Sequence, residues 1–191
     1  MGHGSVAYPI FDDAGHYEFT EEELKQIAFH KSKYPSTRSA VMPALWIAQE
    51  KYGWLSMGVI KLVADTLELP FAQVYGVASF YTMYLKQEVG SFLLEICTCF
   101  TCGECGGDTL YEYAKRVLQL DENGRSADKM FTIREAECLG ACDTAPVCQV
   151  HNRRITHSMT PESFDTLVAE LRQGKYPDYK AVPLPDQKNL F

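Results

Sequence analysis

Four cysteines lie within nine residues near the middle of the chain, and three more follow further along. The first group is Cys97, Cys99, Cys102 and Cys105, and the second is Cys138, Cys142 and Cys148. In a reducing compartment, clustered cysteines are more often metal ligands or catalytic thiols than disulfides. Cys148 lies in the apolar run APVCQV and is interpreted more simply as a small buried hydrophobe. The remaining six predict a metal or redox site.

Three pairings are compatible with an iron–sulfur centre. Cys97 and Cys102 with Cys138 and Cys142 give two ligands from each of two loops, which suits a 2Fe–2S cluster. Cys97, Cys102 and Cys105 with one distal cysteine have the plant-type ferredoxin spacing. We prefer the two-plus-two arrangement, because it uses both cysteines of the CLGAC loop.

The third pairing is the start of a bacterial 4Fe–4S run, formed by Cys99, Cys102 and Cys105. Its second half is missing, because Thr109 stands where the fourth cysteine is required. Histidines do not complete a mixed cluster, since neither cysteine loop contains one.

Two other classes of site stay open. Zinc also binds four thiolates, although structural zinc sites usually use C-x2-C pairs. Cys102 and Cys105 form a C-x-x-C pair between a strand and a helix, as in a thioredoxin-type redox dithiol. The dithiol leaves Cys97, Cys138 and Cys142 unexplained. Glycines in the loops would let backbone N–H groups approach bridging sulfides, and they are Gly103, Gly106, Gly107 and Gly140.

The composition is that of a folded globular protein, with 46% hydrophobic and 23% charged residues in a chain of 191. A net charge of −7 argues against nucleic acid as the main partner, because phosphate binding needs a basic surface. No apolar run reaches the roughly 18 residues of a membrane-spanning helix. The first residues lack the basic and apolar regions of an export signal. We therefore expect a cytoplasmic protein without direct membrane insertion, on the cytoplasmic side of any membrane it reaches through partner subunits.

The elements that must position the cysteines divide into two halves. Residues 19–88 predict a small helical bundle with helices near 20–34, 38–51, 56–69 and 70–84, from caps, prolines and apolar periodicity. Residues 89–173 predict an α/β domain of order β-α-β-β-β-α, whose last helix begins at Thr160 and Pro161. Residues 1–18 are expected to be a flexible lead-in. Residues 174–191 are expected to be an extended tail, either a frayed terminus or an arm on a partner.

The segments ICTCFTC and ECLGACDTAPV resemble the peripheral 2Fe–2S subunit of respiratory NADH:quinone oxidoreductase (complex I). Related subunits occur in NAD-linked hydrogenases and formate dehydrogenases. The helical half resembles the same family in MPALWIAQEKYGWLS and VADTLELPFAQVYGVASFYTMY, so the resemblance covers roughly residues 20–172.

This resemblance implies a helical bundle followed by a thioredoxin-like ferredoxin domain, which is an α+β fold. It implies ligation of one 2Fe–2S cluster by Cys97, Cys102, Cys138 and Cys142. It also implies a partner subunit that carries FMN and binds NADH, and that exchanges single electrons with the cluster within a larger membrane-associated complex. The chain departs from the family pattern in its extra cysteines at positions 99, 105 and 148.

Our hypothesis is a low-potential one-electron centre, although the charges near the expected cluster act in both directions. Acidic side chains in or beside the ligand loops make an added electron costly, and they are Glu95, Glu104, Glu135, Glu137 and Asp143. The helix expected near Gly106 acts in the opposite sense, because its N-terminus favours negative charge. No dinucleotide fingerprint occurs in the chain, so catalysis with NADH is expected to belong to the partner and not to this chain alone.

Overall fold

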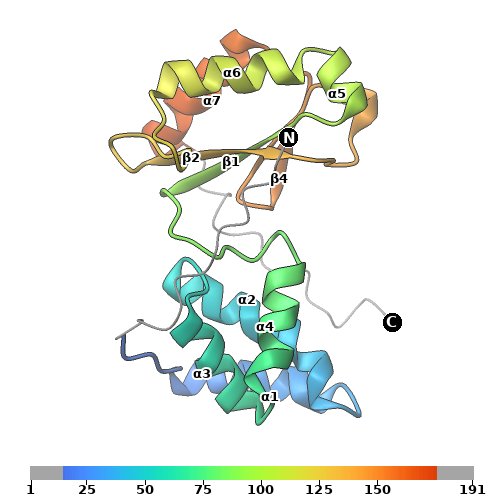
Figure 1. The fold of residues 1–191 in the computed structure, drawn as a ribbon, viewed down its shortest axis with the longest axis vertical. Helices are drawn as coiled ribbons and strands as arrows, with labels where there is room; N and C mark the ends of the chain where they lie inside the picture. The colour runs from blue at the N-terminus through green and yellow to red at the C-terminus, as the bar shows by residue number, and fades with distance from the viewer. Residues whose placement is uncertain (1–14, 176–191) are drawn as a thin grey trace. The chain divides into compact units, whose positions relative to one another are not determined.

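A computed structural model describes residues 15–175 of the chain (Figure 1). The predicted lead-in and tail therefore lie almost wholly outside the described residues. The chain separates into two compact units, and the boundary falls between Glu88 and Val89. The first unit is helical and the second packs helices on a mixed sheet, which confirms the predicted α+β fold class.

Between residues 15 and 88 the first unit contains four α-helices and one short 3-10 helix. They are α1 (Glu21–Ser32), η1 (Thr37–Ala40), α2 (Val41–Tyr52), α3 (Met57–Leu67) and α4 (Phe71–Phe80). The predicted capping box starts α1: the Thr20 N–H donates to Glu23 Oε2 over 2.7 Å, and the Glu23 N–H donates back to Thr20 Oγ1 over 3.3 Å. Pro43 lies in the first turn of α2, where its missing N–H breaks no helical bond.

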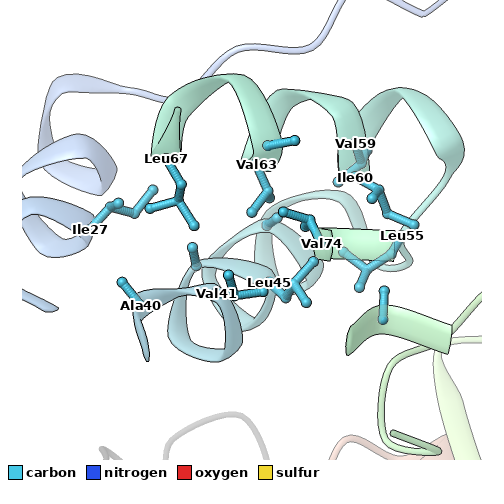
Figure 2. Close-up of a cluster of buried hydrophobic side chains, with 14 of the residues drawn as sticks. Ile27, Ala40, Val41, Leu45, Leu55, Val59, Ile60, Val63, Leu67 and Val74 are labelled. Atoms are coloured by element: carbon cyan, nitrogen blue, oxygen red, sulfur yellow. The ribbon is translucent and has the colours of Figure 1, made fainter. Parts of the chain in front are cut away.

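The core of the first unit is formed by apolar side chains from every one of these helices. Figure 2 shows Ile27 of α1, Leu45 of α2, Ile60 of α3 and Val74 of α4 among the buried side chains of this cluster. The fourth helix is shorter than predicted, because the backbone leaves the helical conformation at Tyr81 and becomes extended (φ −86°, ψ 121°). The segment after α4 therefore has to be fixed by other contacts.

A buried glutamine supplies such contacts. Gln49 of α2 is 6% exposed; its amide donates to the Met83 carbonyl over 3.1 Å and its Oε1 accepts from the Leu85 N–H over 2.7 Å. We expect Gln49→Leu to lower the free energy of unfolding by about 1–3 kcal/mol, because it leaves the buried Leu85 N–H without its Gln49 acceptor. Urea unfolding followed by circular dichroism measures this change.

Gln26→Leu is the matched control, because Gln26 lies exposed on α1. It should change the free energy of unfolding by no more than about 0.5 kcal/mol. Equal effects from the two substitutions would contradict a bracing role for Gln49.

The second unit, described over residues 89–175, is built on a four-stranded sheet of order β2-β1-β3-β4. Its strands are β1 (Phe92–Cys97), β2 (Phe131–Ala136), β3 (Cys148–Val150) and β4 (Arg154–Thr156), and its helices are α5 (Phe100–Glu104), α6 (Gly107–Leu118), η2 (Cys142–Thr144) and α7 (Pro161–Arg172). Strands β1 and β2 are parallel, whereas β3 is antiparallel to both β1 and β4. The predicted order of strands and long helices is confirmed, and the short helices α5 and η2 are additional.

Helices α6 and α7 lie on the same side of this sheet (Figure 1). Leu94 and Ile96 of β1 are fully buried in one cluster with Leu110 of α6 and Phe164 of α7. Because side chains alternate along a strand, Glu95 and Cys97 point to the opposite side. The fold thus places β1 inside the sheet, between β2 and β3, and its last residue, Cys97, lies where the strand ends.

Candidate iron–sulfur site

The two cysteine loops start at the same edge of the sheet. Cys97, the last residue of β1, is in register with Ala136, the last residue of parallel strand β2. The Thr98 N–H donates to the Ala136 carbonyl over 3.1 Å, and the Cys97 N–H donates to the Val147 carbonyl over 3.0 Å. These bonds join the segment after β1, the segment after β2 and the segment before β3. The predicted proximity of the two loops is confirmed.

The four predicted ligands differ in burial. Cys97 and Cys102 are 2% and 1% exposed and pack with Val147 in a small apolar cluster of their own. Cys138 and Cys142 are exposed on the loop that follows β2. The first pair of thiols is therefore part of the protein interior, and the second pair lies on its surface.

Three of the predicted ligands lie close enough for their thiols to influence one another electrostatically. Burial raises the pKa of Cys102 to about 11, and the neighbouring thiols of Cys97 and Cys142 act in the same direction. The Cys97 thiol also lies 3.9 Å from the Glu137 carbonyl on the second loop. Iron binds thiolates, so ligation by Cys102 would release its proton.

Cys138 lies next to a cysteine that was not among the predicted ligands. A bond from the Phe100 N–H lowers the pKa of Cys99, but desolvation and the adjacent Cys138 and Cys97 thiols together raise it above its usual value. Spacing alone did not predict this contact, because it crosses between the two loops. Cys105 is exposed at the C-terminal end of α5, and Cys148 is fully buried in β3, as predicted.

Burial makes the thiol of Cys148 unreactive. Desolvation raises the pKa of this thiol to about 12, and the Glu95 carboxylate acts in the same direction. It is therefore protonated at neutral pH and unreactive as a nucleophile.

The donor set fits a two-iron cluster in its chemistry and its number of thiols. Four thiols from two adjacent loops, two of them in apolar surroundings, are the ligand type that such clusters use. Within residues 15–175, no three His, Cys, Asp or Glu side chains are arranged as a ligand set for a single metal ion. The thiols of Cys97 and Cys142 act on Cys102, and that of Cys138 acts on Cys99, so the two loops, as the structure describes them, are neighbours without forming a single-ion site.

A glycine makes the close packing of the first loop possible. A Cβ atom on Gly107, the first residue of α6, would lie 2.5 Å from the Cys97 carbonyl oxygen and 2.8 Å from that of Cys102. Both atoms belong to the backbone and cannot rotate away. The loop glycines were predicted to give sulfides access to backbone N–H groups. At Gly107 the structure shows a different need: a side chain there would collide with the backbone carbonyl groups of Cys97 and Cys102.

The charges near the site are unevenly exposed. Four of the five acids expected to lower the potential are exposed to water, which screens them, namely Glu104, Glu135, Glu137 and Asp143. The fifth, Glu95, is 5% exposed and pairs with Arg134 of β2, whose Nη2 lies 2.6 Å from Glu95 Oε1. Arg134 was missed at the sequence level, and its only signal was its place in the second predicted strand.

The comparison with known proteins decides the class of cofactor, whereas the choice among the cysteines stays a prediction. The family model described as "Thioredoxin-like [2Fe-2S] ferredoxin" matches residues 27–172. The chain belongs to this family. Its members carry a 2Fe–2S cluster, so the iron–sulfur interpretation of the cysteines takes precedence over zinc and over a dithiol.

Curated relatives of this ferredoxin are named as a subunit of NADH-quinone oxidoreductase. One from Rickettsia bellii is 35% identical over 159 residues, which cover 82% of this chain and 95% of the relative. One from Mycobacterium tuberculosis is 38% identical over 152 residues, but the match covers only 59% of that longer protein.

Among solved structures, a chain of an NAD+-reducing [NiFe]-hydrogenase matches with a TM-score of 0.61 and 18% identity. The match covers 75% of this ferredoxin and 25% of that chain. At this level of identity the likeness establishes the fold alone. In the part of the ferredoxin that the structure describes, no helix has the length and apolar character needed to cross a bilayer.

Proposed function

We propose that this chain is the 2Fe–2S electron-transfer subunit of an NADH:quinone oxidoreductase. The observation that carries the proposal is the meeting of the two cysteine loops at one edge of the sheet, in a family of 2Fe–2S ferredoxins. The names of the curated relatives supply the host complex.

We assign the cluster to Cys97, Cys102, Cys138 and Cys142. A bound cluster would supply one-electron chemistry, which is the type needed for exchange of single electrons with a flavin. The chain's own residues hold the site. Cys97 and Cys102 provide ligands from the apolar side and keep water away, and Cys138 and Cys142 close the site from the exposed loop.

The proposed partner is a subunit that carries FMN and binds NADH, and through it a larger membrane-associated complex. Phe100 supports a contact at the site, because it is 81% exposed on α5 between the cysteines. The helical unit is the proposed docking platform of the complex, and it exposes Phe29 by 55% and Phe80 by 77%.

NAD-linked hydrogenases and formate dehydrogenases remain the alternative hosts. They would use this chain for the same one-electron step with a flavin. The names of the relatives favour the quinone oxidoreductase, whereas the hydrogenase likeness concerns only the fold.

Electron paramagnetic resonance tests the proposal. The anaerobically purified chain should contain about two irons and two sulfides and should give an S = 1/2 signal after dithionite reduction, as expected for one 2Fe–2S cluster. Its midpoint potential should be low. Zinc or free thiols without iron would overturn the proposed cofactor, and a strongly positive midpoint would overturn the proposed exchange with an NADH-linked flavin.

A further inference from the structure

Glu95 and Arg134 form an ion pair next to the proposed ligands. The two residues are direct cross-strand partners in the register of β1 and β2. Glu95 lies two residues before Cys97 on the same side of β1, which puts the two residues roughly 7 Å apart along the strand. A charge at this position lies within electrostatic range of anything that Cys97 binds.

Only one of the two carboxylate oxygens of Glu95 is paired with Arg134. Two hydrogen bonds from Arg134, of 2.8 Å from Nε and 2.6 Å from Nη2, go to Glu95 Oε1. Within the described residues, Oε2 is buried and has no hydrogen-bond partner. The arginine side chain is 35% exposed, whereas that of Glu95 is only 7% exposed. Water therefore screens the positive member of the pair better than the negative one.

We propose that Glu95 and Arg134 together set the reduction potential of the cluster. The Glu95 carboxylate opposes an added electron and lowers the potential, whereas the Arg134 guanidinium offsets that effect. The balance of the pair thus decides how readily the site accepts an electron. This inference rests on the proposed function, because it requires the cluster to be bound near Cys97.

Redox titration of the full chain, followed by the EPR signal of the reduced cluster, tests the proposal. Glu95→Gln keeps an oxygen that can accept from Arg134 and removes only the charge. It should raise the midpoint potential by at least about 59 mV, a tenfold change in the oxidised-to-reduced ratio of a one-electron couple. In Glu95→Gln/Arg134→Gln both charges are removed, so the midpoint should return toward that of the unmodified chain.

Asp128→Asn is the matched control for the loss of one negative charge. Asp128 also pairs with an arginine, since Arg172 Nη1 lies 2.6 Å from its Oδ2, but it precedes β2 and so lies at the end of that strand away from the cysteines. The midpoint potential of the Asp128→Asn protein should shift much less than that of the Glu95→Gln protein. Equal shifts in the two variants would overturn the proposal.

The double variant tests whether the two residues act through opposing charges. A shift in Glu95→Gln that persists in the double variant would mean that the pair does not act through opposing charges, and would also overturn the proposal. Absence of the cluster from the unmodified chain would instead refute the proposed function, so the two failures are distinguishable.

Discussion

Replacing any one of Cys97, Cys102, Cys138 and Cys142 with serine is expected to reduce the cluster content of the purified chain by more than about tenfold. Loss of a residue that only hydrogen-bonds to a metal ligand typically costs about 10–100-fold in metal affinity, and loss of a ligand itself should cost at least as much. Iron and sulfide counting together with the EPR signal of the reduced protein measures the loss.

Serine at Cys105 is the matched control, because this cysteine is exposed and lies at the end of the same loop. The Cys105→Ser protein should keep its iron and its signal. Cys99→Ser gives the sharper comparison, because Cys99 contacts Cys138. If iron is lost in Cys99→Ser and kept in Cys138→Ser, Cys99 is the ligand and the assignment of Cys138 is wrong.

The second large effect is expected from Gly107→Ala, which should destabilise the second unit by about 2–3 kcal/mol, at the upper end of the cost of overpacking. The added methyl group would collide with the carbonyl groups of Cys97 and Cys102, which lie on both sides of the first cysteine loop. Because these atoms are backbone, the loop itself has to shift. Urea unfolding and cluster content should both report the change.

Gly76→Ala controls for the chemical change itself. Gly76 lies inside α4, and a Cβ atom there would meet nothing within 4 Å. This substitution should leave the cluster unchanged and raise the free energy of unfolding by up to about 1 kcal/mol, because alanine is the better helix former. A stable, fully loaded Gly107→Ala protein would contradict the close packing observed at this loop.

Local signals in the sequence were sufficient for the long elements. Thr20, Ser56 and Thr160 each cap a helix that begins where their side chains predicted. The apolar positions of α3 fixed its buried face in the same way. The end of α4 was missed, because no glycine or proline marks the turn to extended backbone at Tyr81.

The site was predictable only as far as chain order allowed. Parallel pairing of β1 and β2 follows from the intervening helix, and it places both cysteine loops at one edge. Helix α5 was not predicted, since its five residues are too few to display a helical period. The contact of Cys99 with Cys138, and the pairing of Glu95 with Arg134, depend on register and on loop conformation. No local pattern in the sequence encodes these contacts.

The difference in burial between the two cysteine pairs has a consequence for biogenesis. Cys97 and Cys102 are already held in the interior, whereas Cys138 and Cys142 lie on the surface. Under the proposed ligand assignment, a preassembled cluster would therefore first meet the two exposed thiols, without unfolding of the sheet. Under the same assignment, oxidants and chelators would also reach the cluster first through these two exposed thiols of the second loop. In the assembled complex, a partner that covers this loop would protect the inserted cluster from both.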